Sequence, residues 1–136
     1  MSLNEFAQDL DAKENGVWTE VSDMRFLIAH VNNSAWKDTY KRLENQAYGS
    51  SKRQKEKRNT EKDVKIMLEC LAATCVLDWE GVALDDEELI FSKAKSIEIF
   101  TDKRFQVLAE MLLEFATDQE RFMEDQVQDD EDLVKK

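Results

Sequence analysis

The sequence predicts a mainly α fold with a small N-terminal β-hairpin (α+β), arranged as a single compact helical domain. The 136 residues contain no proline and three glycines, so few positions interrupt a helix. Apolar residues recur at helical intervals along most of the chain, and only residues 17–31 hold two runs rich in β-branched and aromatic side chains. A chain of this length forms one ordinary domain, which we expect to span residues 1–125.

The N-terminal region is predicted to form a short helix followed by the hairpin. Ser2 and Glu5 have capping-box spacing, apolar residues follow at helical intervals, and Gly16 ends the helix. The hairpin occupies residues 17–31, with its turn at residues 22–24. A lone hairpin is marginally stable in water, so we expect its apolar face to lie on helices.

Two helices are predicted for the middle of the chain. Residues 32–34 form an Asn- and Ser-rich cap before a helix that carries an apolar stripe from Trp36 and ends at Gly49. Thr60 is expected to cap a second helix, whose residues 64–77 are apolar over most of the circumference. Such a helix belongs at the centre of the core.

The C-terminal part is predicted to contain two further helices and a tail. Ser92 precedes a short helix over residues 93–100, and Thr101 caps a longer one that continues to about Met123. Residues 126–136 are rich in Asp and Glu, so we expect an acidic, flexible tail.

Charge and composition favour a soluble binding protein over an enzyme. The chain has 30 acidic and 19 basic residues and a net charge of −11. It contains a single histidine, His30, so it has few of the side chains that a nucleophile–base pair or a zinc site requires. Cys70 and Cys75 are expected to be small buried residues in a reducing compartment. We therefore expect no enzymatic activity, no metal and no cofactor.

The chain shows no membrane span or signal peptide in its sequence pattern. No run approaches 18 consecutive apolar residues, and the first ten residues contain Glu5 and Asp9 in place of a basic and then apolar stretch. A cytoplasmic protein without a membrane partner is the expectation.

Two charged runs are candidate binding sites. Residues 85–88 are all acidic, but they lack the alternating ligands and the glycine of a calcium loop, so a solvated loop is favoured. Residues 52–62 are basic without interleaved aromatic residues, and the net negative charge disfavours nucleic acid. This basic run could instead be a solvated helix face, a mobile loop, or a contact for an acidic surface such as the tail of a sister subunit.

The C-terminal aromatic stripe is the candidate partner-binding surface. Most of it should be core, but its length exceeds what one small domain can cover, and any uncovered remainder would bind a partner. The candidate residues are Phe105, Leu108, Met111, Leu112, Phe115 and Phe122.

Three segments resemble the tail assembly chaperones of long-tailed, non-contractile bacteriophages. The first runs from Gly16-Val17-Trp18 through Arg25-Phe26-Leu27-Ile28-Ala29 to Asn32-Asn33 and Trp36. The second, Val76-Leu77-Asp78-Trp79-Glu80-Gly81-Val82, is the most specific and precedes an acidic turn and a Ser-capped helix. The third is the closing pattern of Phe105 to Phe115, then Asp118, Phe122 and an acidic tail.

The resemblance implies a non-enzymatic protein of the host cytoplasm that is absent from the mature virion. Such a protein binds the tape measure protein, keeps it soluble and recruits major tail subunits; a homo-oligomer is compatible with this role. A virion structural or connector protein and a nucleic-acid-binding regulator are the alternatives. The resemblance assigns structural roles to six motif residues: Trp18, Phe26, Trp36, Asp78, Trp79 and Gly81.

Overall fold

The computed structural model describes residues 3–49 and 58–123, and the predicted tail at 126–136 lies outside these residues. In the described part the strands are β1 (Val17–Val21), β2 (Met24–Ile28), β3 (Val76–Glu80), β4 (Ala83–Leu84) and β5 (Glu87–Glu88). The α-helices are α1 (Leu10–Asn15), α2 (Trp36–Tyr48), α4 (Thr60–Thr74), α5 (Lys93–Phe100) and α6 (Gln106–Thr117). The described residues also form three 3-10 helices: η1 (Leu3–Phe6), η2 (Lys103–Phe105) and η3 (Gln119–Phe122).

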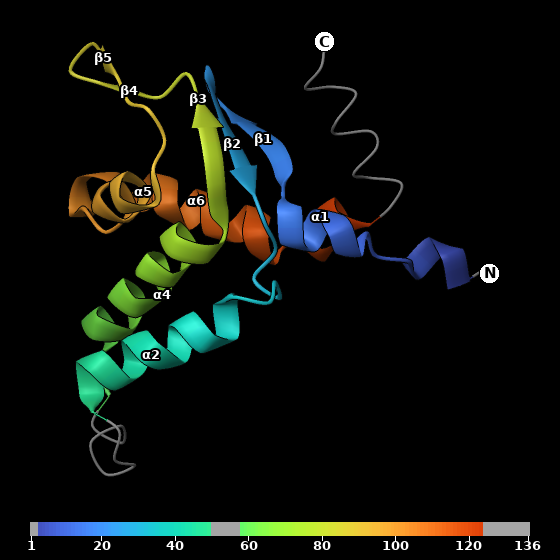
Figure 1. Ribbon diagram of the computed structural model, residues 1–136, viewed down its shortest axis with the longest axis horizontal. Coiled ribbons are helices and arrows are strands. Elements are labelled where there is room, and N and C mark those ends of the chain that lie inside the picture. Colours follow the sequence, from blue (N-terminus) through green and yellow to red (C-terminus); the bar gives the residue numbers. More distant parts are fainter. Residues whose placement is uncertain (1–2, 50–57, 124–136) are drawn as a thin grey trace.

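The central sheet has three antiparallel strands in the order β1-β2-β3. The predicted N-terminal hairpin is confirmed: β1 pairs with β2, and Ser22 enters the tight turn with a positive φ of 59°. The third strand returns to β2 only after α2 and α4, with Trp79 opposite Phe26. Figure 1 shows α4 leading directly into β3 at the foot of the sheet, with α2 alongside α4.

The prediction of a mainly helical domain with one small hairpin is wrong in its share of β structure. The described residues form one sheet of three strands and one of two, and the strands are interspersed among the helices. The error arises mainly at the end of the helix predicted over residues 64–77. The helix ends at Thr74, and Val76 starts β3 opposite Ile28.

Helix α4 ends early because the residues that follow it pair with the edge of β2. The backbone N–H of Ala29 donates to the carbonyl of Cys75 at 2.8 Å, which joins the end of β2 to the start of β3. The residues after Cys75 include valine and tryptophan, which favour strands. A pattern of apolar residues cannot separate a buried strand from a buried helix end, so the sequence signal was ambiguous here.

The acidic run at residues 85–88 forms the tight turn and second strand of the β4–β5 hairpin. Asp85 and Asp86 both adopt positive φ angles, 53° and 66°, as the two central residues of a type I′ turn do. This turn type normally favours Asn-Gly or Asp-Gly, because glycine has no steric cost at positive φ.

Replacing Asp86 by glycine is expected to stabilise the protein by about 0.5 to 1 kcal/mol, because the turn then needs no strained aspartate. Urea unfolding of the two proteins measures this difference. Glu88→Gly is the control, since Glu88 lies in β5 and glycine weakens a strand. Equal or lower stability of the Asp86 variant would contradict the turn assignment.

The main core lies between one face of the central sheet and helices α4, α5 and α6. Phe26 and Ile28 from β2 meet Leu71 from α4 and Leu112 from α6, and all four are buried. Ser96 on α5 is fully buried and donates to the carbonyl of Ala72 at 3.0 Å, which lets α5 approach α4 closely.

Further helix limits differ from those predicted. Asn59 caps α4 in place of Thr60 by accepting from the N–H of Lys62. Asp102, not Thr101, caps the 3-10 turn before α6. The helix expected to reach Met123 stops at Thr117, because Asp118 takes an extended conformation and its side chain accepts from the N–H of Glu120.

The helix predicted before Gly16 is divided into η1 and α1; α1 is capped by Asp9 and ends at Gly16 as predicted. Helix α2 begins after the predicted Asn cluster, where Asn33 accepts from the N–H groups of Ala35 and Trp36, and it ends at Gly49 as predicted. Ser92 caps α5 by accepting from the N–H of Lys95. In the described ranges no helix is long and apolar enough to cross a membrane.

Candidate functional site

Helix α6 presents an exposed apolar edge to solvent. Val107 is 73% exposed and Met111, one turn later, is 39% exposed. The opposite side of the helix is core, since Ala109, Leu112 and Ala116 are fully buried. The helix therefore has apolar side chains on its outer as well as its inner side, and the outer ones form the α6 edge, Val107 and Met111.

The structure places the six predicted partner-binding residues in different environments. Leu112 and Phe122 are buried at 0% and 1% exposure. Phe105, Leu108 and Phe115 are half-buried and pack against the main core. Met111 is the exposed member of the set. Val107, at the more exposed end of the same edge, was outside the candidate set although it lies one helical turn before Met111.

Phe122 belongs to a separate small core. It packs with Ala12 and Val17, and its backbone carbonyl accepts from the N–H of Asp9 at 2.7 Å. The ring of His30 meets the ring of Phe122 edge-on with centroids 4.9 Å apart. This contact fixes the C-terminal turn against α1, so Phe122 does not continue the α6 edge.

His30 has a structural environment. Its Nδ1 accepts from the backbone N–H of Asn32 at 2.9 Å, which places the ring proton on Nε2. Burial lowers the pKa of His30, and nearby Lys13 lowers it further. A neutral, buried imidazole fits the prediction of a structural histidine.

The two cysteines are buried and free, as predicted. Burial raises the pKa of Cys70 to about 11 and that of Cys75 to about 12. Thiols with such pKa values stay protonated at neutral pH and are poor nucleophiles. Over residues 3–49 and 58–123, no group of three or more His, Cys, Asp or Glu side chains is placed to hold a metal ion.

The motif residues from the strands meet in the central sheet. Phe26 and Trp79 are paired across β2 and β3, with ring centroids 6.4 Å apart. Gly81 follows β3 with a φ of 72°, and a Cβ there would lie 3.0 Å from the carbonyl oxygen of Asp23 in the β1–β2 turn. Only glycine satisfies both conditions without strain.

The remaining motif residues hold local structure. Trp18 is half-buried on β1, and the guanidinium of Arg25 lies 4.9 Å from the centre of its ring. Trp36 begins α2 and stacks on Tyr40 at 6.0 Å. The carboxylate of Asp78 accepts from the backbone N–H of Trp79 at 2.8 Å.

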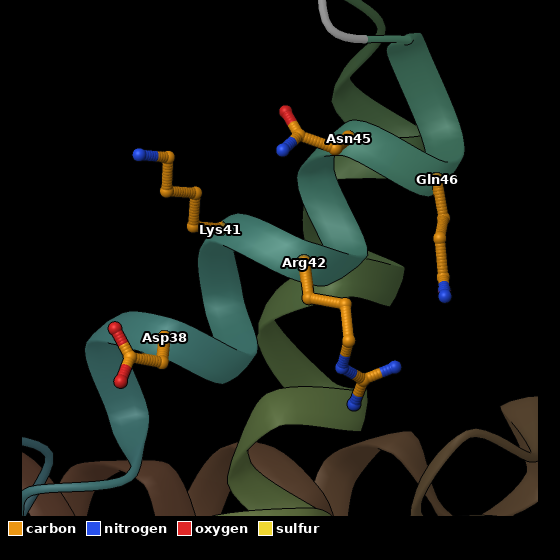
Figure 2. Close-up of a pocket in the computed structure, with 5 residues that line it drawn as sticks. All are labelled: Asp38, Lys41, Arg42, Asn45 and Gln46. Atoms are coloured by element: carbon orange, nitrogen blue, oxygen red, sulfur yellow. The ribbon is translucent and has the colours of Figure 1, made fainter.

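A second candidate surface is a shallow polar hollow on the outer side of α2. Figure 2 shows its five side chains, with Lys41 and Arg42 extending away from each other. Such a surface could attract an anionic group, but among its lining residues there is no aromatic platform for a base. The lining residues are Asp38, Lys41, Arg42, Asn45 and Gln46.

The comparison with protein families decides the origin of the chain. A family model described as YdaY prophage protein matches residues 31–136, which is well over half of the sequence. The chain belongs to the YdaY prophage protein family. No curated protein and no solved structure matches it significantly.

The YdaY match establishes a prophage protein and does not specify a tail assembly chaperone. Its range begins after the β1–β2 hairpin and includes α2, α4, β3 and α6. The α6 edge therefore lies within the part of the chain that the YdaY family shares.

Proposed function

We propose that this YdaY family protein is a tail assembly chaperone of its prophage. It binds the tape measure protein in the host cytoplasm, keeps it soluble and recruits major tail subunits, and it acts without catalysis. The α6 edge is the contact for an apolar helix of the tape measure protein.

The observation that carries this proposal is the exposed apolar α6 edge on a strongly acidic chain. Val107 and Met111 face solvent, while the half-buried Phe105, Leu108 and Phe115 continue the apolar surface inward. A chaperone needs apolar surface to cover its partner, and a net charge of −11 would keep the loaded complex in solution.

Prophage origin and the motif residues support the same role. The YdaY family match supplies a prophage context, in which a tail assembly chaperone would act. The three segments that resemble tail assembly chaperones include the Phe26–Trp79 pair and Gly81, whose positions in the structure explain why those residue types are required.

Co-expression with the tape measure protein of the same prophage tests the proposal. We expect affinity capture of a soluble complex, and we expect the chaperone to be absent from purified particles by mass spectrometry. Stoichiometric presence in particles would instead identify a virion structural or connector protein. Salt-sensitive capture of nucleic acid without tape measure protein would identify a regulator.

Val107→Asp is expected to lower capture of the tape measure protein at least about tenfold, because a carboxylate on the α6 edge opposes burial against an apolar helix. The fold should persist, since Val107 is 73% exposed. Capture is quantified by densitometry at equal bait concentration. Ile90→Asp is the matched control, because Ile90 is 88% exposed and lies outside α6. Equal capture by both variants would exclude the α6 edge as the contact.

A further inference from the structure

The N-terminal arm, residues 3–11, exposes three large apolar side chains. Leu3 is 89% exposed, Phe6 is 60% exposed and Leu10 is 72% exposed. Leu3 and Phe6 are three residues apart in the 3-10 helix η1, so they lie on the same side of it. Single exposed apolar residues are common, whereas three within eight residues indicate a surface that binds something.

An apolar groove lies between α4 and the start of α6. It has a volume of about 720 Å³, and Val64 and Leu68 of α4 contribute apolar side chains to its walls. Thr101, Lys103 and Gln106 line it from the other side. We call it the α4–α6 groove.

The charges of the arm and of the groove are complementary. Lys62, Lys65 and Lys103 line the groove together with one acid, Glu61, which pairs with Lys103 at 3.1 Å. Within residues 3–49 and 58–123, neither Lys62 nor Lys65 forms an ion pair with an acidic side chain. The arm carries three acids and no base, namely Glu5, Asp9 and Asp11.

Figure 1 shows the arm at one end of the long axis and the start of α4, which lines the groove, toward the other end. The base of the arm is held in place, because the backbone N–H of Asp9 donates to the carbonyl of Phe122 and Gln8 forms an antiparallel β-bridge with Met123. The arm therefore cannot reach the groove of its own chain without losing these contacts. A second copy of the chain can supply it.

We propose that the N-terminal arm of one copy docks in the α4–α6 groove of a second copy. Leu3 and Phe6 enter beside Val64 and Leu68, and the acids of the arm face Lys65 and Lys103. The two surfaces are different patches of the same molecule, so the contact is heterologous and can continue from copy to copy. A short arm buries little area, so the association is weak and depends on protein concentration and on salt.

Sedimentation velocity of the full chain over a concentration series at low salt tests this contact. Wild-type protein should form dimers and larger species. The double substitution Leu3→Ser and Phe6→Ser should weaken association about thirtyfold, the effect of losing a central anchor. Ile90→Ser is the control and should associate like wild type. Circular dichroism should show the same fold for all three, since the substituted side chains are exposed.

Mixing two defective proteins separates this contact from other modes of association. Lys65→Glu with Lys103→Glu should disable the groove and leave the arm intact, while the arm variant keeps its groove. Each should sediment as a monomer alone, and the mixture should form a one-to-one complex. Lys41→Glu with Lys93→Glu makes the same change of charge at exposed positions outside the groove and should associate like wild type.

Three results would overturn the proposal. These are a wild-type chain that stays monomeric across the series, variants that associate as strongly as wild type, and a mixture that remains monomeric. None of these measurements involves a tape measure protein, so they do not depend on the proposed chaperone function.

Discussion

Trp79→Ala is expected to lower the free energy of unfolding by about 3 to 5 kcal/mol, the range for loss of a large aromatic side chain from a core. Trp79 is 5% exposed, and its ring meets those of Phe26, Phe91 and Phe100 edge-on, with centroids 5.1 to 6.4 Å apart. Its indole N–H also donates to the carbonyl of Leu89 at 2.7 Å. Chemical denaturation followed by circular dichroism measures the change.

Trp79→Phe separates packing from the hydrogen bond. Phenylalanine keeps an aromatic ring between β3 and α5 but leaves the carbonyl of Leu89 without its donor, so we expect a loss of about 1 to 2 kcal/mol. A similar loss for the alanine and phenylalanine variants would mean that the hydrogen bond, and not the aromatic cluster, dominates. A loss below 1 kcal/mol for alanine would contradict the central position of Trp79.

Asn33→Ala is expected to cost about 2 to 4 kcal/mol, because one buried side chain satisfies backbone groups from three segments. Its Oδ1 accepts from the N–H groups of Ala35 and Trp36 at 2.9 and 3.1 Å, at the start of α2. Its Nδ2 donates to the carbonyls of His30 and Thr74 at 2.6 and 3.3 Å. The side chain thus joins the end of the hairpin, the start of α2 and the end of α4. The same denaturation experiment measures the loss.

Asn32→Ala is the matched control for Asn33, since it makes the same chemical change at an exposed position one residue earlier. We expect it to change stability by no more than about 0.5 kcal/mol. Asn33→Asp should remain destabilising, because it keeps the acceptor for α2 but turns a carboxylate toward two carbonyl oxygens. Equal stability of the Asn32 and Asn33 variants would contradict this account of how the segments are joined.

Patterns that depend on local sequence predicted several single elements, although the fold class was wrong in its share of β structure. The hairpin, the Asn-rich start of α2, the glycine ends and the Ser92 cap follow from side chains that act within a few residues. The end of α4 could not be predicted in this way. Val76 forms a strand because β2 offers it a partner from a distant part of the chain.

Sequence patterns predicted only part of the candidate site. The helical period predicts one stripe of Phe105, Leu108, Leu112 and Phe115, widened by Val107 and Met111, but it cannot show which side of α6 the core covers. The chain turns at Asp118, which separates Phe122 from the stripe and places it against His30. The exposed arm was missed because its apolar spacing is the same as that of a core-facing helix.

The soluble fraction of the tape measure protein, measured with and without this chain in the same cells, tests the central claim most directly. We predict that the tape measure protein is insoluble alone, soluble with wild type or Ile90→Asp, and insoluble again with Val107→Asp. A tape measure protein that stays insoluble with wild type, or that is rescued equally well by Val107→Asp, would contradict a chaperone that works through the α6 edge.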